Sequence, residues 1–174
     1  MKQHARLLLF IRITLASLIA VNLFAIFFFS FQTAEKSAAS SGVLTDKVIE
    51  STVQNFGNKD TAEQENIRLR YHSLVRRFAH RAEYGSLGAL VFLLLLTWKK
   101  HLPIKYVASL FAVFVTAGID EICQIYTDGR SGEFSDVLND LLGATVTCTA
   151  ILLVVAITVL VKRLIARKQA EDSI

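Results

Sequence analysis

The sequence predicts an all-α, polytopic membrane protein built as a bundle of four transmembrane helices. Of its 174 residues, 53% are hydrophobic and only one is proline, and the mean hydropathy is +0.45. A soluble domain of this length is usually less apolar. The apolar residues gather in four blocks, and a helix needs about 20 residues to cross a bilayer core of roughly 30 Å. We expect a single domain, 1–174, with transmembrane helices at about 7–30, 78–98, 104–125 and 136–161.

The first block, residues 7–31, carries Arg12 as its one charge and follows Lys2 and Arg6. A basic start before an apolar stretch also occurs in secretory signal peptides. However, this stretch is longer than the roughly 7–15 residues of a signal core. The block therefore predicts an anchor helix that stays in the protein.

The long first loop, about residues 31–77, contains two amphipathic segments. Apolar residues recur there at helical spacing, in the two sets Leu44, Val48, Ile49, Val53, Phe56 and Ile67, Tyr71, Leu74, Val75, Phe78. Ser37, Ser40 and Ser41 are suited to cap the first of these helices. Arg68, Arg76 and Arg77 give the second helix a basic side. The loop packs on its own membrane domain in one interpretation, and lies among lipid headgroups in the other.

The other three blocks differ in the charges that they contain. Residues 87–98 are apolar throughout, but this block reaches spanning length only if His80, Arg81 and Glu83 lie at or near the membrane surface. Residues 104–119 carry only Lys105, and residues 137–161 carry only Asp140. Each block should be helical, because lipid cannot hydrogen-bond an exposed backbone.

Basic residues predict the orientation in the cell membrane. They flank the first and last helices and fill the short turn between the second and third, as Lys2, Arg6, Lys99, Lys100, Lys105, Lys162, Arg163, Arg167 and Lys168. Cytoplasmic segments carry such an excess of Lys and Arg. We therefore expect both termini in the cytoplasm and the loop 31–77 outside, although that loop also contains several basic residues.

Polar residues cluster at three helix ends. His80, Glu83 and Tyr84 share one face of the second helix. The third helix closes with Asp120, Glu121 and Gln124, the next turn holds Arg130, and the fourth helix opens with Asp136, Asn139 and Asp140. Because consecutive spans alternate in direction, all three sets should meet at the outer face of the membrane.

This predicted cluster has more negative than positive charges. Glu83, Asp120, Glu121, Asp136 and Asp140 outnumber the arginines that can offset them, Arg77, Arg81 and Arg130. Protonated carboxylates, outward-pointing side chains or a bound cation, including a divalent one, would each restore balance. We expect Arg130 to pair with Asp136 or with a carboxylate of the third helix. The cluster is either a working site or a network that only locks the helices together.

The same residues resemble the VanZ-like family of bacterial membrane proteins over most of the chain. The resemblance is carried by the segments 29–40, 77–88 and 120–143, which include Arg77-Phe78-Ala79-His80, Asp120-Glu121-x-x-Gln124, Gly129-Arg130-Ser131-Gly132 and Asn139-Asp140-x-x-Gly143. Cys123 departs from the pattern, because the family usually has His before this Gln. The resemblance implies a bacterial inner-membrane protein of the cell envelope. The family is named for a member linked to resistance to the glycopeptide antibiotic teicoplanin.

Three classes of function follow. The first is a resistance protein whose outer polar cleft binds a lipid headgroup or a lipid-linked cell-wall precursor. Its binding residues would be Gln124, Arg130, Asp136, Asn139 and Asp140. The second is an intramembrane, metal-assisted enzyme, with His80, Glu83, Asp120 and Glu121 as catalytic candidates. The third is a structural or partner-binding protein. Membrane lipids are the expected partners and nucleic acid is not, because the basic residues lie on membrane flanks. No metal or cofactor is named by the sequence, and His72 is assigned no role.

Overall fold

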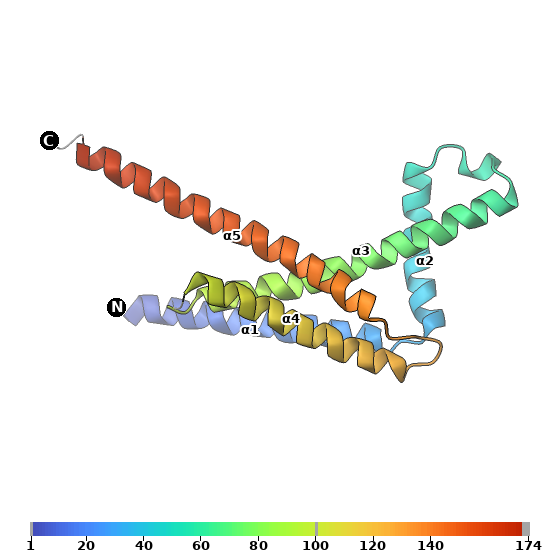
Figure 1. Ribbon diagram of the computed structural model, residues 1–174, viewed down its shortest axis with the longest axis horizontal. Helices are drawn as coiled ribbons and strands as arrows, with labels where there is room; N and C mark the ends of the chain where they lie inside the picture. Colours follow the sequence, from blue (N-terminus) through green and yellow to red (C-terminus); the bar gives the residue numbers. More distant parts are fainter. Residues whose placement is uncertain (1, 100, 172–174) are drawn as a thin grey trace.

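The computed structural model describes residues 2–99 and 101–171, and helices account for nearly all of them (Figure 1). The elements in order are α1 (Lys2–Ser30), α2 (Ala34–Thr52), the 3-10 helix η1 (Phe56–Asn58), α3 (Thr61–Leu96), α4 (Leu102–Ile125) and α5 (Phe134–Glu171). The described part of the chain contains no strand. The all-α helical bundle expected from the sequence is confirmed.

Three helices, α1, α4 and α5, are long and apolar enough to cross a membrane. This finding is consistent with a membrane protein, but it falls short of the four spans that the sequence predicts. The difference lies in α3, whose continuous apolar run covers only 87–96, while Arg81 and Glu83 lie one to two turns earlier. The second amphipathic segment of the loop and the second apolar block form this one continuous helix.

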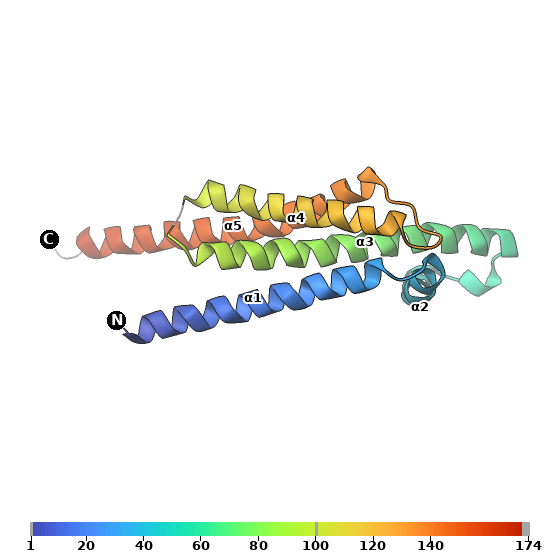
Figure 2. The ribbon, with the colours of Figure 1, turned by 90° about the horizontal axis from the view of Figure 1, so that it is seen from below.

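The helices alternate in direction, so α1 and α4 end where α3 and α5 are polar (Figure 1). Seen from below, α3, α4 and α5 lie together and α1 packs beneath them (Figure 2). The short helix α2 lies across the end of the bundle and packs on the first half of α3. Thr45 and Ile49 of α2 are buried in that contact.

Small residues let α3 and α5 cross at close range. A Cβ atom added to Gly88 of α3 would stand 2.8 Å from the Cβ atom of Ala144 in α5. One added to Gly143 would meet the carbonyl oxygen of Arg81. Small residues commonly permit such backbone contact between membrane helices. This crossing brings the polar start of α5 against the turn of α3 that begins at His80.

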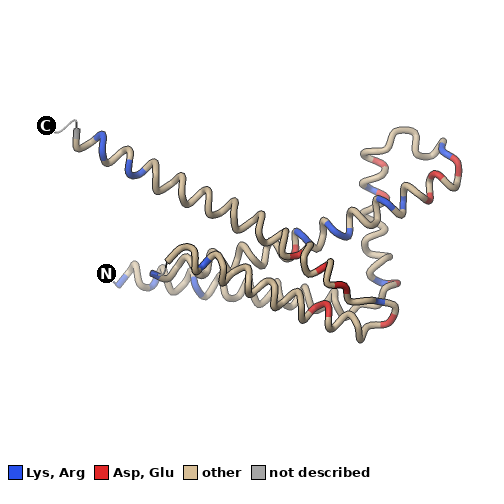
Figure 3. The backbone as a smooth tube through the Cα atoms, viewed as in Figure 1, with Lys and Arg blue, Asp and Glu red and all other residues tan. Residues whose placement is uncertain are grey.

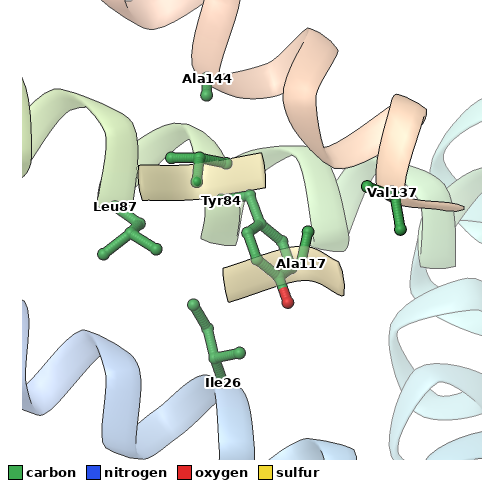
Figure 4. Packing of buried hydrophobic residues seen from close by; sticks show 7 residues of the cluster. Ile26, Tyr84, Leu87, Ala117, Val137 and Ala144 are labelled. Carbon is green, nitrogen blue, oxygen red and sulfur yellow. The ribbon is translucent and has the colours of Figure 1, made fainter. Parts of the chain in front are cut away.

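The buried core lies around Tyr84, where side chains from α1, α3, α4 and α5 meet (Figure 4). Its members are Ile26, Tyr84, Leu87, Val113, Ala117, Val137 and Ala144. Most other large apolar side chains face outward, for example Phe111 at 65% exposed and Val154 at 64%. An apolar exterior of this kind suits contact with lipid.

The start of α2 differs from the sequence prediction. The helix begins at Ala34, and the Thr33 side chain caps it by accepting a hydrogen bond from the Lys36 backbone N–H. The serines proposed as caps lie inside the helix instead, where the Ser41 hydroxyl donates to the Ser37 carbonyl at 2.8 Å. Capping depends on which residue first leaves helical geometry, and the apolar spacing does not show this.

Candidate functional site

The acidic residues of the bundle gather at one end (Figure 3). They lie where α4 ends and α5 begins, and Lys and Arg also occur at that end. At the opposite end, the start of α1, the start of α4 and the last turns of α5 carry Lys and Arg. The structure brings the polar residues in the middle of α3 together with the end of α4 and the start of α5, as the alternation of helices predicts.

Gln124 joins the two carboxylates at the end of α4. Its side-chain amide donates to Asp120 Oδ2 at 3.0 Å and to Glu121 Oε1 at 3.2 Å. Glu121 Oε2 in turn accepts a hydrogen bond of 2.8 Å from the backbone N–H of Glu133, just before α5. All three side chains of α4 are buried. The network therefore fixes the end of α4 to the start of α5.

His80 of α3 faces Asp140 of α5 across the helix crossing. Their Nδ1 and Oδ1 atoms are 3.6 Å apart, and the Asp140 side chain is fully buried. This distance is longer than a good hydrogen bond. The His80 ring stacks on Tyr84 one turn later, with the ring centroids 6.5 Å apart.

Several buried acceptor atoms of this cluster have no hydrogen-bond partner within the described residues. They are Asp120 Oδ1, Gln124 Oε1 and both carboxylate oxygens of Asp140. The Tyr84 hydroxyl lies beside Asp120 but does not meet the geometry of a hydrogen bond. Buried polar groups in proteins are normally paired, so these oxygens are the acceptor atoms of the cluster that are open to a further polar contact.

Asn139 is hydrogen-bonded across the contact between α3 and α5, whereas Glu83 is not ion-paired in the described chain. Arg81 Nε of α3 donates to Asn139 Oδ1 at 2.7 Å, and Asn139 Nδ2 donates to the Arg77 carbonyl at 3.4 Å. Asn139 therefore holds α5 onto α3. Glu83 is half-buried near Asp120 and Asp140, and it makes no ion pair within residues 2–99 and 101–171.

The predicted pairing of Arg130 with Asp136 or with a carboxylate of the third predicted helix is wrong. Its Nη1 atom donates to the carbonyls of Phe29 and Ser30, at 3.0 and 3.1 Å, and no salt bridge joins it to Asp136 or α4 in the described chain. The last carbonyls of a helix lack intrahelical partners and carry partial negative charge, so the guanidinium binds the end of α1. Burial lowers the pKa of Arg130, and the nearby charge of Arg76 acts in the same direction. An arginine nevertheless stays charged at neutral pH.

A polar cavity opens beside this cluster, with a volume of about 240 Å³. It is lined by two walls, His72, Ser73, Arg76, Arg77 and His80 from α3 and Asp136 and Asn139 from α5. The sequence pattern predicts no role for His72 and places Arg76 only on the basic side of the second amphipathic segment. The spacing of His72, Arg76 and His80, four residues apart each time, places them on one helical face and was the available signal.

A larger hollow of about 840 Å³ lies elsewhere, in the corner between α1 and α2. Four phenylalanines line it, Phe24, Phe27 and Phe28 from α1 and Phe31 from the turn after it, and Lys36 of α2 also lines it. Beside a membrane helix, such a surface is ordinary lipid contact. We therefore place the candidate site at the polar cavity and not at this larger apolar hollow.

Metal-ligand geometry is absent from the described residues, where no group of three or more His, Cys, Asp or Glu side chains is placed to hold a metal ion. Cys123, at the position where the family usually has His, is a half-buried free thiol. The carboxylates instead contact an amide, a backbone N–H and a histidine.

A family model provides the decisive comparison. The VanZ/LLP1 model matches residues 15–158, a span that contains every candidate site residue. The chain belongs to the VanZ/LLP1 family. The resemblance inferred from the motifs is therefore confirmed, and the polar end of the bundle lies wholly within the region that the VanZ/LLP1 model describes. No curated protein and no solved structure matches the chain.

Proposed function

We propose that this VanZ/LLP1 protein is a four-span protein of the bacterial inner membrane that binds the phosphate-bearing headgroup of a lipid at its outer face. The polar cavity carries the proposal. Arg76 and Arg77 line it together with His72, and guanidinium groups bind phosphate through paired, charge-assisted hydrogen bonds. A membrane phospholipid and a lipid-linked cell-wall precursor both present this chemistry.

The placement in the membrane supports an outer-leaflet site. The apolar part of α3 lies within the bundle beside α4 and α5, so we propose it as the fourth span. Basic residues mark the end that holds both termini, and the positive-inside rule assigns that end to the cytoplasm. The cavity at the opposite end then opens at the level of the outer headgroups.

Occupation of this site would change what a glycopeptide antibiotic encounters at the outer surface. The family is named for a member linked to teicoplanin resistance, and a protein that holds a surface lipid or precursor could protect it from the drug. Asn139, which hydrogen-bonds the Arg81 side chain and the Arg77 carbonyl, holds the α5 wall of the cavity against the α3 wall. A resistance role for this chain follows as part of the same proposal.

His80 supports a second candidate function, an intramembrane enzyme. Its ring lines the cavity while Nδ1 faces the buried Asp140 carboxylate at 3.6 Å. An imidazole oriented by a carboxylate is a common general base. Turnover of a phosphate ester that depends on His80 would favour this alternative over binding alone.

The main test is teicoplanin susceptibility in a bacterium that expresses the protein. We expect the wild type to raise the inhibitory concentration, and Asp120→Asn and Arg76→Gln to abolish the gain without lowering the membrane level or the melting temperature. Arg163→Gln, at the opposite end of α5, is the matched control and should behave as wild type. If Asp120→Asn and Arg76→Gln retain full protection, the site has no part in resistance; if both unfold the protein, its role is structural.

A further inference from the structure

The two walls of the polar cavity carry opposite charges that do not pair with each other. Arg76 and Arg77 stand on the α3 wall, and Asp136 stands on the α5 wall. Within residues 2–99 and 101–171, neither arginine forms a salt bridge of 4.0 Å or less with Asp136. A space of about 240 Å³ lies between these charges.

Acidic side chains continue behind the α5 wall. Asp136 is close enough to Glu121 and Asp140 for their charges to interact. Asp140 and Asp120 also hold buried carboxylate oxygens without a hydrogen-bond partner in the described chain. A ligand carrying only phosphate would be attracted by the arginines and repelled by this wall. A ligand that also carried a cation would satisfy both walls.

We propose that the lipid held in the cavity has a zwitterionic aminophospholipid headgroup, with a phosphate and a primary ammonium. The phosphate contacts Arg76 and Arg77, and the ammonium donates hydrogen bonds to Asp136. This inference rests on the proposed function and specifies its ligand. Pockets for drug-sized ligands occupy roughly 300–1,000 Å³, so this smaller cavity takes a headgroup and leaves the acyl chains in the membrane.

The experiment is native mass spectrometry of the purified full-length protein with defined phospholipids of identical acyl chains. Phosphatidylethanolamine should bind about tenfold more tightly than phosphatidylglycerol, the effect of one charge-assisted hydrogen bond. Successive methylation of the amine, ending at phosphatidylcholine, should weaken binding stepwise because donors are lost. Soluble glycerophosphoethanolamine is the competitor that separates a free headgroup from a lipid: weak competition supports a lipid ligand, and competition equal to that of the lipid overturns it.

Two variants separate the inference from the proposed function. Asp136→Asn should remove the preference for ethanolamine while phosphatidylglycerol binds at least as well as before. Arg76→Gln should weaken both lipids, and Arg163→Gln should change neither.

If phosphatidylethanolamine and phosphatidylglycerol bind the wild type equally, and both still need Arg76, the preference for a zwitterionic headgroup is wrong and phosphate binding is retained. If Arg76→Gln binds both lipids as tightly as the wild type does, both proposals are wrong. The methylation series needs only the wild type, so it decides the question even if Asp136→Asn fails to fold.

Discussion

The side-chain amide of Gln124 holds two neighbouring carboxylates of the candidate site in place. Its one amide group has two N–H donors, and the structure directs them at two carboxylates of the same helix. Two buried carboxylates one residue apart repel each other when ionised. The amide offsets this repulsion, and Glu121 gains a further donor from the Glu133 backbone.

Replacing Gln124 by leucine should therefore destabilise the protein. The change leaves Asp120 Oδ2 and Glu121 Oε1 without their amide donor, and a buried polar group left unpaired costs about 1–3 kcal/mol. Thermal unfolding in detergent measures the loss. Ile122→Ala is the control, since Ile122 lies on the same helix with its side chain pointing away from the bundle, at 57% exposed. An unchanged melting temperature for Gln124→Leu would show that the amide network does not contribute to stability.

The glycine of α5 at the helix crossing gives a second prediction at this scale. Gly143→Ala places a methyl group against the Arg81 backbone, so α3 and α5 must separate, and overpacking of this kind costs about 1–3 kcal/mol. Gly118→Ala in α4 is a matched control because its added Cβ atom meets nothing within 4 Å. There, the gain in helix propensity should stabilise the protein slightly. The two melting temperatures should move in opposite directions; equal shifts would contradict the packing argument.

At the scale of elements, α2 connects the long first loop to the candidate site. The Ser41 hydroxyl hydrogen-bonds His72 Nε2 at 2.7 Å, and His72 lines the polar cavity. Ile49, at 1% exposed, anchors the same helix against α3. Of the two interpretations of the loop, packing against the protein is therefore the one that the described contacts show for α2. The position of α2 also influences the α3 wall of the cavity.

Removing the anchor should release this helix without unfolding the bundle. Ile49→Ala deletes a buried side chain, a change that costs about 2–5 kcal/mol in a packed contact. Hydrogen exchange should rise throughout α2 while α4 remains protected, because local units open independently. Leu44→Ala is the control, as Leu44 is 50% exposed on the same helix. Uniform exchange across α2 and α4 would show that α2 is not a separate unit.

At the scale of the whole molecule, the charge distribution predicts the topology. The start of α1, the start of α4 and the end of α5 lie at the basic end of the bundle, and η1 lies beyond the acidic end. Reporter fusions near residue 100 and after Lys168 should therefore report a cytoplasmic location, and a fusion near Asn58 an external one. A cytoplasmic signal near Asn58 would reverse the orientation and move the cavity to the inner leaflet.

Much of the architecture could be predicted because its causes are local. Helical periodicity and the length of the apolar blocks predict helices at 104–125 and 7–30. The structure has α4 at Leu102–Ile125 and α1 at Lys2–Ser30. The shared polar end follows from the alternation of helices alone. Helix ends were less accurate: α5 continues to Glu171, well past the expected 161, because an exposed helix does not need to stop where its apolar residues do.

The sequence by itself determined which residues are helical, which are apolar and which family the motifs resemble. Only the tertiary structure decided what each polar side chain contacts. Arg130 binds the end of α1 and not Asp136. The packing of α1 against the bundle places the Phe29 and Ser30 carbonyls within reach of the guanidinium. His72 enters the cavity wall because α3 crosses α5 at a glycine. Such pairings join residues far apart in the chain, and their geometry depends on helix packing, which residue spacing within one helix does not encode.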